Sequence, residues 1–376
     1  HPGSIGAALK EIELLVKRQN SVHQNASLFE LIEDCVNLGT TPFSVLARHG
    51  FIAKTLLLSL VERGVLSYND LHQIQSGIQT IAGELVYDMH QLQIGQLTRK
   101  DFMVRYGHLR PGTYDILSLR YDQIENFGMT EIKNSALQMQ PVAFSISDQK
   151  KMQISRLLQE EGFTTFDCDL FLEYIRAATV GREYGKFVFT RTVSDLLEAI
   201  ALWGEQFNLS RDELLHIPID EILRTLTESI TDITQYLKQC AVSNAKIHET
   251  SVAIRLPQLL FDEAGVHIVP FQVSQPNFIT QKKVNAECVR VSADSSDYVL
   301  ANKIVLIENA DPGFDWIFAH SIAGLITKYG GANSHMAIRC AEFAIPAAIG
   351  CGEQRFETYL KADKLLLDCA AGVIEL

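Results

Sequence analysis

The chain has 376 residues, of which 47% are hydrophobic and 21% charged, and its formal net charge is −12. This composition is ordinary for a globular protein of two or three domains. The acidic balance argues against a general binder of nucleic acid or membrane surfaces, because phosphate-rich partners need basic patches. We also expect no membrane span, since no apolar run approaches the roughly 20 residues that one needs.

Seven cysteines are scattered along the chain without a Cys-x-x-Cys pair. An odd number without ligand spacing indicates reduced thiols rather than a disulfide framework or a zinc site. We therefore expect a cytoplasmic protein without metal ligands of its own. The first four residues, HPGS, resemble an expression scar, and we expect the chain to be the C-terminal part of something longer.

From about residue 5 to 250 the pattern is helical. Apolar residues recur at three- and four-residue spacing in segments 28–38, 51–66 and 68–92. Three motifs resemble helix starts, with a capping residue ahead of acidic residues: SYND (67–70), SRDE (210–213) and PIDE (218–221). This region is predicted to be an all-α domain of about ten helices.

Near residue 250 the pattern changes to short β-type runs bounded by Gly, Pro, Asn and Asp. These runs are VHIVPFQV (266–273), CVRVS (288–292), KIVLIEN (303–309), AAIG (347–350), KLLLD (364–368) and GVIEL (372–376). Helices are predicted between them at 314–324 and 334–343. The sequence thus predicts a multidomain α and α/β protein, with a helical domain at 5–250, a linker at 251–265 and a compact α/β domain at 266–376.

His335 lies where a glycine-containing loop is predicted to enter a helix. Gly330 and Gly331 permit close backbone approach to a ligand, and Asn333 or Ser334 can cap the helix. In the first turn, free N–H groups and the helix dipole disfavour the imidazolium and favour an anion attached to the ring. The position therefore suits a neutral, nucleophilic histidine that takes up a phosphoryl group and gives it away. From these arguments alone, an ordinary helix start that happens to carry a polar residue is the favoured interpretation, because a histidine in a first turn is common.

The residues around His335 resemble the signature of the phosphohistidine swivelling domain of phosphoenolpyruvate-utilising enzymes. These enzymes include phosphoenolpyruvate synthase, pyruvate phosphate dikinase, enzyme I of the sugar phosphotransferase system and rifampin phosphotransferase. The signature positions are Thr327, Gly330, Gly331, Ser334, His335, Ala337, Ile338, Glu342, Ile345, Pro346, Ala347 and Gly350. The upstream segment 305–327, with its Asp311-Pro312-Gly313 turn, and the tail 365–376 fit the same domain. The resemblance implies that His335 is the catalytic phosphocarrier.

The segment RYGHLRPGTYDILSLRYD (105–122) resembles the Gly-His-Arg segment in the helical linker of the synthase and rifampin-phosphotransferase group. Leu109 stands where Arg is usual, and Arg110 can substitute for it. His108, Arg110 and Arg120 are therefore candidates for an acceptor or anion site. The alternative is that they are loop residues satisfied by local carboxylates such as Asp115 and Asp122.

Two positions depart from the family pattern. Ala341 stands where the family usually has Arg, and Ala344 stands where Gly usually precedes Ile-Pro. Arg339 lies four residues after His335 and therefore on the same helix face, from which it could reach a phosphate on the ring. The expected phosphate-binding residues are Gly330, Gly331, Asn333, Ser334 and Arg339.

Basic residues of segment 176–191, namely Arg176, Arg182, Lys186 and Arg191, are expected to form a solvated helix face. Asp311 is interpreted first as a turn residue, with contact to the histidine loop as the alternative. Cys340 and Cys351 are expected to be packing thiols.

The resemblance implies a phosphoryl donor site that this chain lacks. In the family an ATP-grasp domain, using ATP and Mg²⁺, or a phosphoenolpyruvate-binding barrel phosphorylates the histidine, and neither pattern is evident here. We expect the ATP-grasp domain to be supplied in cis or in trans, a small-molecule acceptor such as pyruvate, and no nucleic-acid or membrane partner. An oligomer is compatible with the sequence. The alternative function is a non-catalytic binding or regulatory module that retains the swivelling-domain fold.

Overall fold

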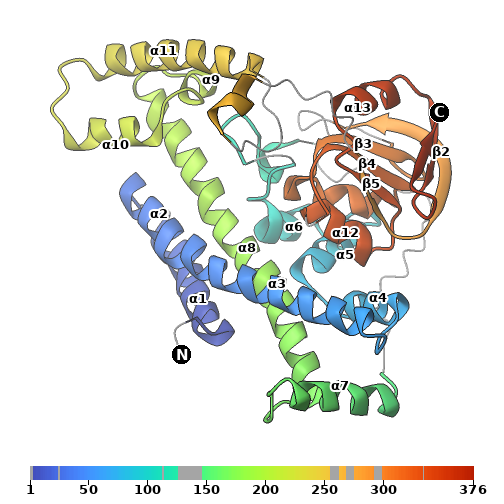
Figure 1. Ribbon diagram of the computed structural model, residues 1–376. Coiled ribbons are helices and arrows are strands. Elements are labelled where there is room, and N and C mark those ends of the chain that lie inside the picture. The colour runs from blue at the N-terminus through green and yellow to red at the C-terminus, as the bar shows by residue number, and fades with distance from the viewer. Residues whose placement is uncertain are drawn as a thin grey trace.

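The computed structural model describes most of the chain. The described residues are 3–23, 26–111, 114–125, 146–254, 262–267, 275–291, 299–332 and 334–376. A helical region forms the N-terminal two thirds, and a sheet with short helices forms the C-terminal part (Figure 1).

The helical region is built of α-helices. Their bounds are α1 Ile5–Ser21, α2 Leu28–Asp34, α3 Thr41–Glu62, α4 Tyr68–Ser76, α5 Ile81–Gln93, α6 Arg99–Tyr106, α7 Asp148–Glu160, α8 Cys168–Glu205, α9 Arg211–Leu214, α10 Ile219–Thr227 and α11 Ile233–Ala253. A π-helical segment, η2 (Cys35–Thr40), joins α2 to α3, and a 3₁₀ turn, η3 (Tyr121–Gln123), follows α6.

Local sequence explains where several helices start. Ser67 and Ser210 each cap a helix in a reciprocal capping box, with Asp70 and Glu213 as the acidic partners, as the motifs predicted. The third predicted start is also correct, although Pro218 precedes α10 without a side-chain cap. The pattern at 68–92 forms two helices instead of one continuous helix, because α4 ends at Gly77 and Thr80 caps α5.

Helix α8, with 38 residues, is the axis of the helical region (Figure 1). Helices α1 and α3 pack along it, and α3 comes very close at Gly185. A Cβ atom on Gly185 would lie 2.6 Å from a methyl carbon of Leu46, so a larger residue there would push the helices apart.

One described helical run, Leu28–Glu62, is long and apolar enough to cross a membrane by length and composition. This corrects the expectation that no run reaches that length, because α2, η2 and α3 continue into one another over 35 residues. The finding is weak evidence, since core helices of soluble proteins pass the same test. The buried positions of α3 include Leu46, Ala53 and Leu57, which join two of the hydrophobic clusters of the helical region.

The C-terminal part is built on a mixed sheet in the order β1-β5-β4-β3-β2-β6-β7. The strands are β1 Asn277–Ile279, β2 Lys283–Arg290, β3 Ile304–Asn309, β4 Gly324–Tyr329, β5 Ala347–Ile349, β6 Lys364–Asp368 and β7 Val373–Glu375. The central strands β2, β3, β4 and β5 are parallel, and β1, β6 and β7 add antiparallel edges. Helical elements in this part are η4 Glu263–His267, η5 Pro312–His320, α12 His335–Glu342 and α13 Glu353–Tyr359.

The predicted mixture of a helical region and an α/β region is therefore correct, with two corrections in detail. Segment 314–324 is not an α-helix: it forms the 3₁₀ helix η5 and then enters β4, a strand that the sequence did not predict. Of the predicted strand 266–273, the first two residues end η4, and the rest lies outside the described residues. Helix α11 ends at Ala253, and the division into domains at 5–250 and 266–376 stays a prediction.

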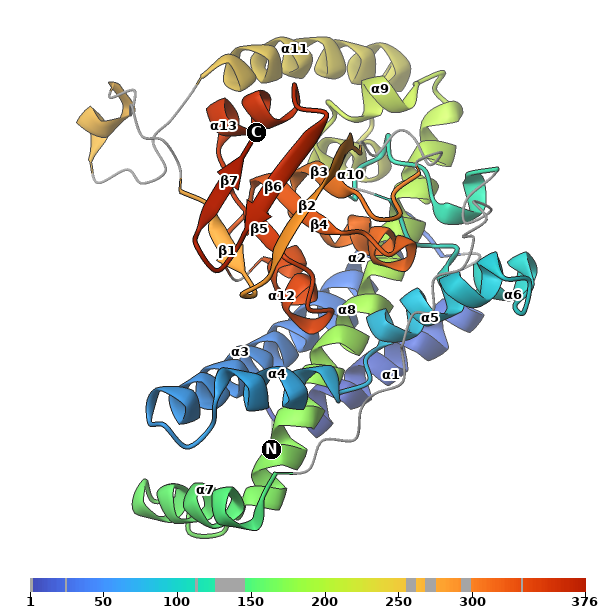
Figure 2. The same ribbon diagram turned by 90° about the vertical axis from the view of Figure 1, so that its right-hand side faces the viewer.

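The two regions share one hydrophobic core. On one face of the sheet, η5 and α12 pack together with α5 and α6 of the helical region, so that Phe102 and Tyr106 join a cluster with Ile317 and Met336. The other face is covered by α13, whose Phe356 lies in a separate cluster. Figure 2 shows α12 between the sheet and the helices α3, α4 and α8.

Candidate functional site

The chain direction brings His335 to one edge of the sheet. Strands β3 and β4 are parallel neighbours, so their carboxyl ends lie at the same edge. After β3 the chain enters η5, which carries Asp315, and after β4 it passes the Gly330–Gly331 pair and enters α12 at His335. Two residues that are 20 positions apart in sequence thus meet at this edge.

The loop before α12 needs glycine at one position of its pair. Gly330 has a φ of +130°, and a Cβ atom there would lie 2.6 Å from the Cβ of Ala310. Gly350, at the end of β5, packs on the Gly330 carbonyl so closely that its own Cβ would lie 2.3 Å from that oxygen. Thr327 holds these segments together, because its hydroxyl accepts from the Gly350 N–H at 2.9 Å and donates to the Tyr329 carbonyl.

His335 is the first residue of α12, directly after the capping residue Ser334. The Ser334 hydroxyl accepts a hydrogen bond from the Ala337 N–H, as the sequence allowed. The ring Nε2 lies 2.7 and 2.8 Å from the two carboxylate oxygens of Asp315, and Nδ1 lies 3.5 Å from the ammonium nitrogen of Lys186 on α8. The histidine therefore sits between a carboxylate of its own region and a cation of the helical region.

Burial sets the charge of this pair. Burial lowers the pKa of His335, and the Lys186 and Arg339 cations lower it further, although Asp315 opposes them. Burial opposes ionisation of Asp315, but His335, Arg339 and Lys186 outweigh it and hold its pKa below the ordinary value. An ionised Asp315 only accepts hydrogen bonds, so the neutral ring carries its proton on Nε2 and has its lone pair on Nδ1.

Burial also lowers the pKa of Lys186, while Asp315 and Glu183 act in the opposite direction. Two carboxylates thus stabilise the charge of this partly buried ammonium group electrostatically. A cation in this position is suited to contact an anionic group carried by His335.

Buried ion pairs connect α12 to α8 beside the histidine. The guanidinium of Arg339 pairs with Glu183 of α8 and with Glu342 of its own helix, and its Nε lies 3.6 Å from Asp315. Glu183 also accepts from Arg182 at 2.6 Å. Burial opposes ionisation of Glu183, but the arginines hold its pKa well below the ordinary value.

A small cavity of about 60 Å³ opens beside these residues. Its polar lining includes His335, Lys186 and Thr190, and Tyr114 and Tyr121 add aromatic wall. Burial raises the pKa of Tyr114 to about 12, so this hydroxyl remains protonated and can donate a hydrogen bond at neutral pH.

The structure brings together part of the predicted phosphate-binding set. Gly330, Ser334 and Arg339 surround the start of α12, with Arg339 and His335 lining the same cavity. Gly331 is exposed, and an added Cβ would meet nothing within 4 Å. Asn333 lies outside the described residues. The donors of Arg339 already contact carboxylates, and phosphate contact by this set stays a prediction.

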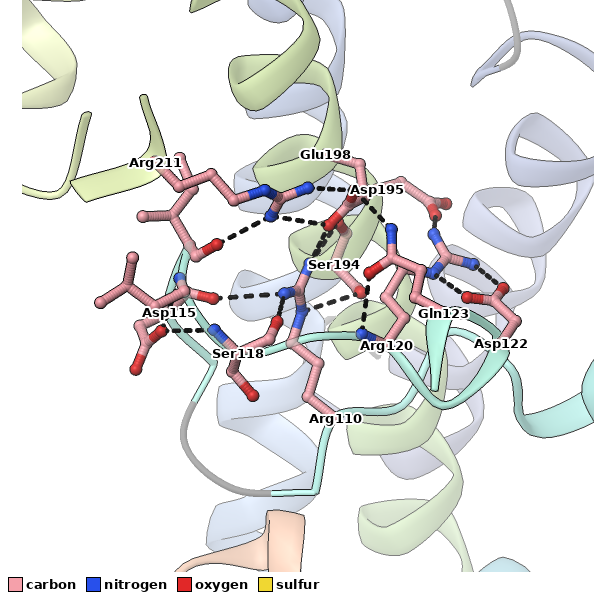
Figure 3. Close-up of polar contacts among 12 residues, drawn as sticks. Arg110, Asp115, Ser118, Arg120, Asp122, Gln123, Ser194, Asp195, Glu198 and Arg211 are labelled. Carbon is pink, nitrogen blue, oxygen red and sulfur yellow. Dashed lines mark hydrogen bonds and ion pairs between the residues drawn. The ribbon is translucent and has the colours of Figure 1, made fainter. Parts of the chain in front are cut away.

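Arg110 lines the same small cavity as His335, and its guanidinium, like that of Arg120, belongs to a network centred on Glu198 (Figure 3). The buried Arg110 contacts the Glu198 carboxylate at 2.8 Å, Ser194, and the carbonyls of Asp115 and Ser118. Arg120 pairs with Asp122 at 3.0 Å and Asp195 at 2.8 Å. Arg120 thus pairs with the local carboxylate that the alternative named, whereas the carboxylate partner of Arg110 is the distant Glu198.

His108 is buried against the Phe187 ring, with the ring centroids 4.9 Å apart. Burial lowers its pKa to about 3, helped by the Arg191 and Arg120 cations, so the ring is neutral. A neutral buried ring is poorly suited to bind an anion. An acceptor role for His108, Arg110 and Arg120 stays a prediction.

Sequence reasoning missed the two nearest partners of His335. One of them is Asp315, four residues after Asp311, whose carboxylate contacts the His335 ring. Lys186 and Arg182 were expected on a solvated face, whereas both are partly buried and face α12 or its partners. Cys340 and Cys351 are buried, as expected of packing thiols. Within the described residues no group of His, Cys, Asp and Glu is arranged to hold a metal ion.

Comparisons with known proteins find similarity in the segment that carries His335. Residues 300–372 match the family described as "PEP-utilising enzyme, mobile domain". A phosphoenolpyruvate synthase from Neisseria meningitidis serogroup B is 31% identical over 93 residues, and one from Deinococcus radiodurans is 32% identical over 92 residues. Each match covers 24% of this chain and 12% of the relative, so the chain spans a small part of these relatives.

These matches confirm the resemblance that the residues around His335 indicated. The C-terminal part of the chain is similar to the mobile domain of phosphoenolpyruvate-utilising enzymes, a group concerned with phosphoryl transfer. The matched segment includes Asp315 and the whole of α12, but neither Lys186 nor Glu183.

Proposed function

We propose that this chain is the phosphoryl-carrier part of a phosphoenolpyruvate-synthase-like phosphotransferase. His335 takes a phosphoryl group from a nucleotide site and passes it to a small-molecule acceptor such as pyruvate. The nucleotide site belongs to an ATP-grasp domain, in cis or in trans, that uses ATP and Mg²⁺. The protein acts in the cytoplasm.

The observation that carries this proposal is the surroundings of the His335 ring. A neutral imidazole stands at a helix N-terminus, with a carboxylate 2.7 Å from Nε2 and an ammonium group 3.5 Å from Nδ1. The carboxylate fixes the ring orientation and tautomer, as in other nucleophile and base pairs. The ammonium group supplies the positive charge that a phosphoryl group on the ring requires.

The transfer proceeds in two steps. A lone pair of His335 attacks a nucleotide phosphorus, a P–N bond forms, and the phosphoanhydride P–O bond breaks. An acceptor oxygen, which for pyruvate is the enolate oxygen left by loss of a C3 proton, then attacks the phosphorus. The P–N bond breaks, and its electron pair returns to the ring nitrogen. Splitting the transfer in this way lets each step occur in its own oriented site.

The two steps require the C-terminal region to change position. In the present arrangement both ring nitrogens have partners, and α12 is held to α8 through Arg339 and Glu183. A nitrogen that attacks phosphorus must give up its partner, so donor access requires α12 to leave α8. We propose that the arrangement described here corresponds to the acceptor-facing state, with Lys186 as the cation that meets the phosphoryl group.

The test is to phosphorylate the chain and locate the phosphate. The chain is incubated with an ATP-grasp donor domain, ATP and Mg²⁺, and in parallel with phosphoramidate, which phosphorylates reactive histidines without a protein donor. Peptide mass mapping at mildly alkaline pH should find one acid-labile phosphate on the His335 peptide. His335→Gln should lack it, and His49→Gln, altering a histidine of the helical region, should retain it.

Lys186→Met tests the second step separately. It should leave phosphorylation by the donor domain nearly unchanged and slow the loss of phosphate to an acceptor. If the folded chain gains no phosphate on His335 from either donor, the carrier proposal is wrong. That result would favour the alternative, a binding or regulatory module that keeps the domain fold.

A further inference from the structure

A second and much larger cavity lies between the two regions, beside α12. Its volume is about 980 Å³, at the upper end of the range for organic-ligand pockets. Helices α3, α4 and α8 form one wall, and α12, the loop before it and β1 form the other. Figure 2 shows α12 and β1 on the side of the sheet that faces α3 and α4.

Most of the cavity wall is apolar. Leu57, Leu71 and Ile78 contribute from the helical region, and Phe278 and Ile338 from the C-terminal region. Its mouth includes Tyr68, whose side chain is 74% exposed. A cavity of this size and lining is suited to the apolar body of an organic molecule.

The charged groups on the wall are mainly basic. Lys54, Arg182 and Lys282 line the cavity together with one carboxylate, Glu342, which pairs with Arg339. Burial lowers the pKa of Lys54, and the nearby Arg182 cation lowers it further. Two cations that repel each other beside an apolar wall form a place where an anionic group gains from both.

The backbone makes room for one of these cations. A Cβ atom on Gly50 of α3 would lie 2.8 Å from the Arg182 Cδ, so this glycine lets the arginine stem lie against α3. From there Arg182 reaches Glu183, which in turn pairs with Arg339 beside His335. Two consecutive ion pairs, Arg182–Glu183 and Glu183–Arg339, thus connect the large cavity to the histidine site.

We propose that this interdomain cavity binds an amphiphilic organic anion. The apolar body lies between the leucines of α3 and α4 and the α12–β1 wall, and the carboxylate or phosphate group lies against Lys54 and Arg182. The inference does not depend on phosphoryl transfer at His335, which does not line this cavity.

Because both regions supply walls, such a ligand favours the arrangement in which α12 is docked. A ligand that binds one arrangement shifts the population toward it by its differential affinity. The bound anion is therefore expected to oppose the release of α12 from α8.

The experiment is isothermal titration of the full chain with decanoate, below its micelle concentration, as a simple apolar anion. One saturable site is expected. Acetate and inorganic phosphate, which lack the apolar body, should give no comparable site. Lys54→Met should weaken decanoate binding about tenfold, the effect of losing one charge-assisted hydrogen bond. Lys10→Met, on an exposed part of α1, should leave binding unchanged.

A second pair of variants tests the location. Ala341→Trp places a large side chain in the cavity from α12 and should abolish binding. Ala47→Trp makes the same substitution on the wall of a different groove on α3 and should preserve binding. Circular dichroism establishes whether each variant is folded. If Ala341→Trp does not fold, the binding affinity of Lys54→Met decides whether the inference holds. Absence of saturable decanoate binding to the unaltered chain would overturn the inference. So would equal effects of the two tryptophans or of the two lysine substitutions.

Discussion

The buried pair between Glu183 and Arg339 gives the sharpest stability prediction. The side chains are 5% and 2% exposed, and they join α8 to α12. Replacing Glu183 by Gln keeps the shape of the side chain but removes its charge. The Arg182 and Arg339 guanidinium groups would then face each other across a neutral amide.

The magnitude follows from the contacts. Removing one partner of a buried ion pair typically costs about 3–5 kcal/mol, because the other charge stays buried. Arg339 keeps Glu342 and the 3.6 Å contact with Asp315, so we expect about 3 kcal/mol for Glu183→Gln. An exposed pair offers a control, since Arg63 and Glu161 are 52% and 56% exposed. Glu161→Gln should therefore cost less than about 1 kcal/mol.

The assay is urea unfolding followed by circular dichroism, with free energies from linear extrapolation. A double-mutant cycle with Arg339→Met isolates the pairwise term, and the double variant should be more stable than the sum of the single losses predicts. The reasoning fails if Glu183→Gln costs no more than Glu161→Gln, or if the two substitutions at the buried pair are additive.

Three further predictions concern the loop, the histidines and the arginine network. Gly330→Ala should lower the free energy of unfolding by about 1–3 kcal/mol, because a Cβ there is strained and clashes, whereas Gly331→Ala should change it by less than about 0.5 kcal/mol in the same urea assay. Burial lowers the folded-state pKa of His108 to about 3 and of His320 to about 4. Between about pH 6.5 and 5 these histidines are therefore protonated in the unfolded chain but stay neutral in the folded chain. Stability should thus fall with falling pH, and His108→Gln should reduce that slope by about 1.4 kcal/mol per pH unit; an unchanged slope would contradict the assigned burial effect. Arg110→Met should destabilise the chain by about 3 kcal/mol without slowing phosphorylation of His335, and a selective loss of transfer to the acceptor would instead support the predicted acceptor site.

Local patterns in the sequence were sufficient for much of the fold. Ser67 and Ser210 start helices where the motifs placed them, since a capping box involves residues only three apart. Strand β4 was missed, because a short apolar run at 322–326 is compatible with either a helix or a buried strand. A helix was expected around 176–191, but its full length as α8 was not predicted, because many small and polar residues break the amphipathic pattern where neighbouring elements bury more than one face.

The sequence by itself determined that a histidine follows a glycine pair at the start of an amphipathic helix, and that this segment resembles a phosphohistidine signature. Those features depend on residues within about two turns of one another. Only the tertiary structure decided which charges face the ring. Asp315 reaches His335 because parallel strands end at one edge of the sheet, and Lys186, 149 positions earlier, reaches it because α12 packs on α8. No local pattern encodes a distance of that kind, since it depends on the path of all the chain between the two residues.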